Sequence, residues 1–216
     1  MKLKYYYWYF QSAIPPRICD DIIRYGKEAK SREQMALTGD IGRTDGNPRD
    51  FKKQPLSKKE IKDLKKKRDS NIVWMSDRWI YKEIQPYIHE ANRRAGWNFD
   101  WEYSESCQFT KYKLGQYYGW HTDAWEEPYT DKGPTQGKIR KLSVTVSLSD
   151  QKDYTGGELE FQLRNMDDPT PSQQCTEILP KGSLVVFPSW TWHRVKPVKT
   201  GTRYSLVIWN VGKPYR

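Results

Sequence analysis

Residues 112–123 read YKLGQYYGWHTD and hold two metal-binding residue types close together. His121 and Asp123 are separated by a single residue. On an extended strand, side chains at positions i and i+2 point to the same face and lie a few ångströms apart. Both side chains can therefore reach one ion, and the stretch predicts a strand that ends at a metal site.

A third ligand must come from elsewhere in a chain that has only 3 histidines. His193 is the natural candidate because it closely follows the strand-like run 183–187. Two imidazoles and one carboxylate on one side of an ion leave the opposite side open, as in non-haem Fe(II) oxygenases. A His-x-Asp pair is also common by chance, so the pair needs support from other positions.

Arg203 gives that support because it lies ten residues after His193. A turn at residues 199–201 would return the chain along a strand from Arg203 to Trp209, and place the guanidinium at the far end of a bound dicarboxylate. Arginine binds a carboxylate through two parallel hydrogen bonds, which lysine cannot form. Ser205 lies on the same face and can add a hydroxyl group. The alternative is an ordinary surface arginine paired with an acid.

The composition indicates a folded domain with an aromatic interior or cleft. The chain has 216 residues, of which 36% are hydrophobic, and it contains 10 Trp and 15 Tyr. Aromatic side chains bury large areas each, so a few of them replace many aliphatic ones. The net charge of +10 favours anionic partners, such as a charged small molecule, a nucleic acid or an acidic protein.

The cysteines and the N-terminus predict a cytoplasmic protein. Cys19, Cys107 and Cys175 are odd in number and widely spaced, which argues against a disulfide framework or a zinc site. The N-terminus lacks the pattern of a signal peptide. No apolar stretch approaches membrane-spanning length, so we expect no membrane association.

The first hundred residues are predicted to be mainly helical. Helices are expected from Pro16 to about Lys30, after a capping box at residues 57–60, and from about residue 77 to Gly96. Pro86 falls inside the last pattern and predicts a kink or a break. Residues 5–10 and 71–75 read as strands, and residues 31–55 as a loop.

From residue 100 onward, short apolar runs alternate with turn signals such as Lys-Gly-Pro at 132–134 and Pro-Lys-Gly at 180–182. This rhythm predicts many short strands in a sandwich or barrel. We expect a single domain over residues 1–216, with a helical N-terminal support (1–99) and a β core (100–212).

The spacing Tyr-x-x-Gly-x-x-Tyr-x-x-His-x-Asp resembles the 2-oxoglutarate/Fe(II) oxygenases of the prolyl 4-hydroxylase type, and is similar to the PKHD-type hydroxylases. Further segments agree in order: RKLS at 140–143, LSD at 148–150, YTGGEL at 154–159, LPKG at 179–182, FPS at 187–189, HRVKPV at 193–198, GTR at 201–203 and Trp209. The resemblance covers roughly residues 70–212, and earlier residues match only loosely.

The resemblance implies an α+β, mainly β fold: a double-stranded β-helix (jelly-roll, cupin-like) core with N-terminal supporting helices. It implies that His121, Asp123 and His193 bind Fe(II). It also implies that Arg203 binds the far carboxylate of 2-oxoglutarate, with help from Tyr112 and Ser205. The alternative for Tyr112 is a buried aromatic residue that fills the core.

The activity implied is that of a dioxygenase that uses O₂ and 2-oxoglutarate to hydroxylate a C–H bond, with release of succinate and CO₂ and with support from L-ascorbate (vitamin C). A prolyl residue of a peptide or protein is the expected substrate. The alternatives are a free amino acid, a small metabolite, an alkylated nucleobase, or a non-catalytic jelly-roll that binds a partner. Nucleic-acid demethylases of the superfamily usually carry a second arginine after the co-substrate arginine, and residues 204–212 contain none.

Three aromatic residues, Tyr118, Trp125 and Trp209, are candidates for the substrate cleft. The loop 124–137 is either a flap over the substrate or a plain connection. The basic run 58–68 is expected to be a solvated face, although it could contact nucleic acid. The sequence does not indicate an oligomeric state.

Overall fold

Strands from both halves of the chain build the larger of two main sheets. The computed structural model describes residues 3–29, 32–44, 47–124, 127–163 and 172–215. The order in the larger sheet is β1 (Trp8–Phe10), β14 (Leu184–Pro188), β10 (Ile139–Ser147), β17 (Arg203–Gly212), β8 (Cys107–Tyr112), β6 (Asn71–Met75) and β2 (Gln34–Met35), with β7 (Tyr103–Ser104) beside β17.

The smaller main sheet has five strands in the order β13 (Gln173–Gln174), β12 (Leu159–Gln162), β15 (Trp192–Val195), β9 (Tyr117–His121) and β5 (Arg68–Asp69). Two short pairs complete the strands: β11 (Tyr154–Gly156) with β16 (Val198–Gly201), and β3 (Arg43–Thr44) with β4 (Asn47–Pro48). Two 3₁₀ turns, η2 (Gln151–Asp153) and η3 (Thr176–Ile178), lie in connections.

An apolar layer lies between the two main sheets. It contains Tyr112 from β8 and Phe187 from β14 on one side, with Phe161 from β12 and Val195 from β15 on the other. The alternation of side chains along each strand puts these residues on the inner faces. The expected jelly-roll core is therefore present as two facing sheets, which remain separate among the described residues instead of closing into a barrel.

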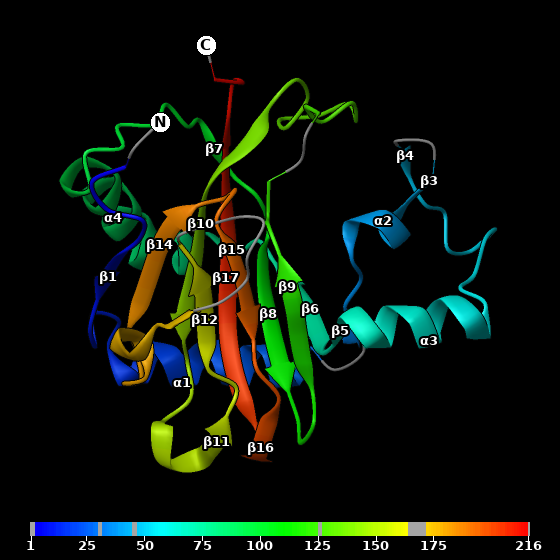
Figure 1. Cartoon of the computed structure of the whole chain (residues 1–216), viewed down its shortest axis with the longest axis horizontal. Helices are drawn as coiled ribbons and strands as arrows, with labels where there is room; N and C mark the ends of the chain where they lie inside the picture. The colour runs from blue at the N-terminus through cyan, green and yellow to red at the C-terminus, as the bar shows by residue number, and fades with distance from the viewer. Residues whose placement is uncertain (1–2, 30–31, 45–46, 125–126, 164–171, 216) are drawn as a thin grey trace.

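Two helices cover the outer face of the larger sheet. The helices α1 (Pro16–Glu28) and α4 (Arg78–Arg94) place Ile22 and Ile84 in one buried cluster with Val144 of β10 and Leu206 of β17. Figure 1 shows both helices behind the large sheet, whereas α2 (Gly39–Gly42) and α3 (Lys58–Lys67) extend to one side beyond β5 and β6. The predicted helical support is thus α1 and α4.

The structure corrects two local predictions. The predicted break at Pro86 is absent, because Ile84 and Ile88 on either side are fully buried and hold the helix α4 against the sheet while Pro86 faces solvent. Residues 31–55 are not all loop, since they contain α2 and three two-residue strands. The capping box is confirmed: Ser57 Oγ accepts from the Glu60 N–H, and the Glu60 carboxylate accepts from the Ser57 N–H.

The N-terminal part also supplies strands to both main sheets. β6 pairs with β8 in the larger sheet, and β5 pairs with β9 in the smaller one, where Arg68 lies opposite Tyr118. This segment therefore forms part of the framework around the candidate site. No helix within the described ranges is long and apolar enough to cross a membrane.

Candidate metal centre

The pairing of β9 with β15 brings two histidines together. His121 is the last residue of β9, and its register partner on β15 is His193. Asp123 follows two residues later and is held by its backbone, because the N–H groups of Asp123 and Ala124 both donate to the Ser189 carbonyl at 2.9 Å. Sheet register and one turn thus assemble three side chains from distant parts of the sequence.

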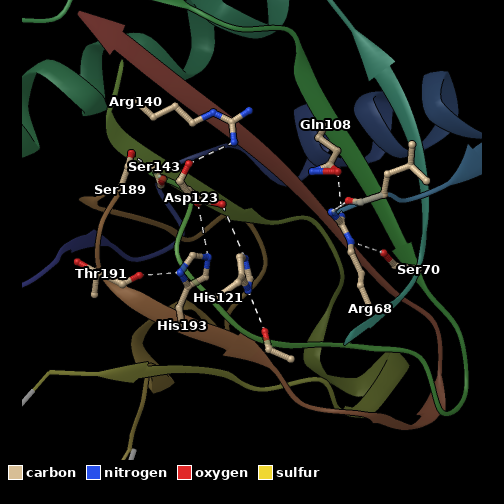
Figure 2. A network of polar contacts seen from close by, with 12 residues as sticks. Arg68, Ser70, Gln108, His121, Asp123, Arg140, Ser143, Ser189, Thr191 and His193 are labelled. Atoms are coloured by element: carbon tan, nitrogen blue, oxygen red, sulfur yellow. Dashed lines mark hydrogen bonds and ion pairs between the residues drawn. The ribbon is translucent and has the colours of Figure 1, made fainter. Parts of the chain in front are cut away.

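One ligand atom from each of the three side chains lies within 4.8 Å of the other two. His121 Nε2 is 3.7 Å from one carboxylate oxygen of Asp123, and His193 Nε2 is 3.5 Å from the other. The Nδ1 atoms face backbone carbonyls at 2.9 Å, those of Gly119 and Thr191 (Figure 2). A carbonyl can only accept, so Nδ1 carries the proton and the Nε2 lone pair of each ring faces the carboxylate.

Burial makes this cluster a site for a cation. Burial lowers the pKa of His121 well below 6.5, and the neighbouring His193 lowers it further, so the His121 ring is neutral. Burial alone would raise the pKa of Asp123, but the positive charge around it, including that of Arg140, outweighs burial and holds the pKa below 3.8. The Asp123 Oδ2 atom is buried and has no hydrogen-bond partner among the described residues. A buried anionic oxygen of this kind requires a cation.

Arg203 is more buried than Asp123 and His193, with 3% of its surface exposed. Its Nη1 donates to Ser205 Oγ at 3.1 Å, and its guanidinium carbon is 5.5 Å from the ring centre of Tyr112, its register partner on β8. It makes no ion pair with any described residue. The alternative of a surface arginine paired with an acid is therefore wrong.

A narrow inner cavity of about 30 Å³ connects Arg203 with the three clustered side chains. Its lining contains all six residues predicted for the metal and co-substrate: Tyr112, His121, Asp123, His193, Arg203 and Ser205.

A wider outer cleft of about 730 Å³ opens beside His121 and Asp123. It is lined by aromatic rings from several elements, including Trp74 of β6 and Trp120 of β9. Four residues besides the two metal-site residues line both the cleft and the inner cavity: Arg68, Gln108, Tyr118 and Trp209. These four mark the junction between the two spaces.

Two of the three residues predicted for the substrate cleft, Tyr118 and Trp209, lie at this junction. The Tyr118 ring stacks on His121 with ring centres 3.5 Å apart, and burial raises the pKa of Tyr118 to about 12. Trp209 is 6% exposed at the far end of β17. The third candidate, Trp125, lies outside the described residues. In the later part of the loop 124–137, the Gly137 N–H donates to the Tyr129 carbonyl at 2.8 Å.

Sequence reasoning missed three polar residues at the site, namely Arg68, Gln108 and Arg140. Arg140 forms two hydrogen bonds to Glu105 and lies 3.9 Å from the ring centre of Trp209. Arg68 was included in a basic run expected to be solvated, yet it is 5% exposed. The signal was its position: Arg68 and Ser70 are separated by one residue in extended chain, and both are buried and hydrogen-bonded to each other.

Comparison with known proteins agrees with this geometry. Residues 107–211 match the family model of the 2OG-Fe(II) oxygenase superfamily. A PKHD-type hydroxylase of Synechococcus sp. (strain CC9902) is 38% identical over 105 residues, which are 48% of this chain and 40% of that protein. A PKHD-type hydroxylase of Xanthomonas axonopodis pv. citri is 34% identical over 101 residues, 47% of this chain and 41% of that protein. The chain thus spans less than half the length of these relatives.

Solved structures share the fold along nearly the whole chain. The viral collagen prolyl hydroxylase of Paramecium Bursaria Chlorella virus-1, in complex with 2OG, has a TM-score of 0.63 at 20% identity and covers 97% of each chain. A Trichoplax adhaerens prolyl hydroxylase, in complex with a hypoxia inducible factor peptide fragment, has a TM-score of 0.65 at 16% identity, covering 96% of this chain and 84% of that one. At these identities the likeness establishes the fold.

Proposed function

We propose that this protein, whose residues 107–211 match the family model of the 2OG-Fe(II) oxygenase superfamily, uses Fe(II), 2-oxoglutarate and O₂ to hydroxylate a C–H bond, with release of succinate and CO₂. One observation carries the proposal: the buried Asp123 carboxylate lies beside two imidazoles, with His121 Nε2 3.7 Å from one oxygen and His193 Nε2 3.5 Å from the other, and the latter oxygen has no hydrogen-bond partner among the described residues. Two histidines and one carboxylate form the facial arrangement that non-haem Fe(II) oxygenases use.

The three side chains fit the metal well. His121 and His193 offer Nε2 lone pairs, because the backbone carbonyls of Gly119 and Thr191 fix the proton on Nδ1. Asp123 supplies the negative charge that partly balances a divalent ion. We assign these three side chains as the Fe(II) ligands.

The inner cavity fits one end of a dicarboxylate. A buried guanidinium without an acidic partner is costly, and a carboxylate that accepts two hydrogen bonds from it would remove that cost. Arg203 is such a group, and the Ser205 hydroxyl lies beside it at 3.1 Å. We assign Arg203, Ser205 and Tyr112 to the far carboxylate of 2-oxoglutarate.

When bound, Fe(II) and 2-oxoglutarate together supply the oxidising chemistry, in which the co-substrate is converted to succinate and CO₂ as one oxygen atom enters the substrate. The protein's own contribution is placement and exclusion of water. Arg203 and the ligand cluster orient the co-substrate between them. The aromatic residues at the junction, Tyr118 and Trp209, restrict water at the open side of the metal. Ascorbate is proposed to support turnover by keeping the iron reduced.

A prolyl residue of a peptide or protein is the proposed substrate. Two curated relatives are named PKHD-type hydroxylases, and one structural neighbour is a prolyl hydroxylase with a peptide fragment. The open outer cleft, with Trp74 and Trp120 in its lining, suits an extended peptide whose proline ring packs on aromatic faces.

The test is an anaerobic titration of the full chain with Fe(II) and 2-oxoglutarate, followed by exposure to O₂ with a library of proline-containing peptides. We expect the weak visible charge-transfer band of the chelate, and then a mass gain of one oxygen atom on a peptide. An Asp123→Ala variant should lack both signals. If the wild-type chain binds Fe(II) and 2-oxoglutarate without forming that band, the assignment of the metal ligands is wrong.

A further inference from the structure

Arg68 is a second buried arginine near the metal site, and the proposed chemistry does not use it. It is 5% exposed and lies on β5. Its guanidinium donates to Ser70 Oγ at 3.0 Å, to the Leu37 carbonyl at 3.2 Å and to Gln108 Oε1 at 2.9 Å. All three acceptors are neutral, and Arg68 makes no ion pair with a described residue. Its positive charge is therefore buried without a counter-charge.

The position of Arg68 separates it from the co-substrate residues. Arg203, Tyr112 and Ser205 line the inner cavity but not the outer cleft. Arg68, in contrast, lines both spaces. The Arg68 guanidinium carbon lies 4.3 Å from the ring centre of Tyr118, and that ring stacks on His121. A group bound by Arg68 would thus lie on the substrate side, one aromatic ring away from a metal ligand.

The charges around the cleft favour an anion. Among the described lining residues, four are Lys or Arg, namely Lys66, Lys67, Arg68 and Arg140, and Asp123 is the one acid. Glu105 offsets the charge of Arg140 through two hydrogen bonds of 2.9 and 2.7 Å, and Asp63 pairs with Lys66 at 2.8 Å, whereas no described acid forms an ion pair with Arg68. A cleft lined by one sign of charge attracts ligands of the opposite sign.

Trp209 offers a second donor at the same junction. Its indole Nε1 is buried without a hydrogen-bond partner among the described residues, and its side chain lines both spaces. A buried N–H without an acceptor is unfavourable, and an acceptor on a bound ligand would remove that cost. Two donors at one junction, one of them charged, match a carboxylate, whose two oxygens accept several hydrogen bonds.

We propose that Arg68 determines substrate specificity: together with Trp209 it binds a carboxylate of the substrate close to the C–H bond that is oxidised. The carboxylate belongs either to an acidic side chain next to the reacting residue of a peptide or to a free amino acid. This inference rests on the proposed function, and it narrows the substrate to an acidic one.

The experiment compares matched pairs of probes that differ only in charge. One pair is a capped peptide with glutamate beside the proline and its glutamine counterpart; the other is N-acetylproline and N-acetylprolinamide. Binding to the full chain loaded anaerobically with Fe(II) and 2-oxoglutarate is measured by calorimetry. We expect one carboxylate form to bind about tenfold to a hundredfold tighter than its amide, as for a hydrogen bond to a charged group. The preferred pair identifies the source of the carboxylate.

Variants then assign the preference to Arg68. Arg68→Gln should bring the two members of the preferred pair within about twofold of each other by weakening the acid alone, if one charge-assisted contact supplies the discrimination. Lys62→Gln, which removes the same charge from the exposed face of α3, should leave the preference intact. Trp209→Phe keeps an aromatic ring but removes the indole N–H, and should lower the preference for the acid over its amide several-fold. This variant tests the proposal independently, in case Arg68→Gln does not fold.

The outcomes separate this inference from the proposed function. If the wild-type chain forms no chelate band, the proposed function fails. If the band forms but neither acid binds tighter than its amide, including no binding by either, the role of Arg68 is wrong. A preference that survives Arg68→Gln, or a phosphoserine peptide that binds tighter than the glutamate peptide, would also overturn it.

Discussion

At the scale of single residues, the candidate site is a set of buried charges and donors that lack partners within the part of the chain that the structure describes. Asp123 carries an unpartnered oxygen, Arg203 and Arg68 carry uncompensated guanidinium groups, and Trp209 carries an unpartnered N–H. Burying such groups is unfavourable unless ligands complete their contacts. These groups therefore lower the stability of the ligand-free protein and leave it able to bind ligands. Substitutions at these positions test which ligand each group binds.

Removal of a metal ligand should abolish turnover. In His121→Ala or Asp123→Ala, two side chains remain to bind Fe(II), and we expect no succinate above background in an assay with O₂ and 2-oxoglutarate. A matched control is His89→Ala, since His89 lies exposed on α4 and stacks on Trp101 away from the cluster. Equal succinate yields from the Asp123→Ala and wild-type enzymes would contradict the ligand assignment.

Substitution of Arg203 should weaken 2-oxoglutarate binding more than metal binding. Arg203→Ala removes a charge-assisted contact of about 1.5–3 kcal/mol, which corresponds to roughly a tenfold to hundredfold rise in the apparent Kd. Arg203→Lys keeps the charge but loses the planar fork, so its Kd should be intermediate. The chelate band titrated with 2-oxoglutarate reports both values, and an unchanged Kd in Arg203→Ala would refute the carboxylate assignment.

At the scale of elements, the register between strands converts distant residues into a site. The pairing of β9 with β15 sets His121 opposite His193, and the pairing of β8 with β17 sets Tyr112 opposite Arg203. The repeat of two residues along a strand made the shared face of His121 and Asp123 predictable from sequence. The meeting with His193 came from the chemistry of the metal and from the family resemblance, because register between distant strands leaves no local signal.

Arg68 illustrates what local patterns could not reveal. It ends a run of lysines that forms the solvated helix α3, so composition assigns it to the surface. The chain turns inward at β5, which pairs with β9, and this long-range contact buries Arg68 beside Gln108. The helix start at Ser57 was predictable because a capping box involves residues only three apart. The helix α4 continues through Pro86 without the expected break because tertiary packing outweighs local propensity.

The packing of α1 on the sheet gives a prediction about stability. In a helix interior, Gly→Ala usually stabilises by about 0.5–1 kcal/mol. At Gly26, however, a Cβ atom would lie 2.5 Å from the buried ring of Phe109 on β8. We expect Gly26→Ala to destabilise the fold by about 1–3 kcal/mol, because overpacking forces the ring or the helix to shift. Urea unfolding measures this, with Glu28→Ala on the exposed end of α1 as the control; a more stable Gly26→Ala variant would mean that the contact relaxes freely.

At the scale of the whole molecule, binding of the metal and of 2-oxoglutarate should stabilise the fold, since the Asp123 carboxylate and the Arg203 guanidinium each gain a partner. A ligand at about 100 times its Kd stabilises the native state by about 2.7 kcal/mol. For a chain of this length that shifts Tm by roughly 5–11 °C. We expect Mn(II), used as an O₂-stable substitute, to raise Tm, and 2-oxoglutarate to raise it further only when the metal is present. EDTA should reverse both shifts, and a 2-oxoglutarate effect without metal would indicate a different binding mode.

The pairing of β5 and β6 with the core has a consequence for how the protein can be dissected. The matched segment begins at residue 107, yet β6 covers one edge of β8 and β5 covers one edge of β9. A fragment that starts near residue 100 would leave both edges without neighbours, and exposed strand edges template self-association. It would also lack Arg68, whose side chain lines the junction between the inner cavity and the outer cleft. The minimal unit for expression is therefore larger than the homologous segment, and a fragment should retain the chain from β1 onward, because β1 pairs with β14 and α1 packs on the larger sheet.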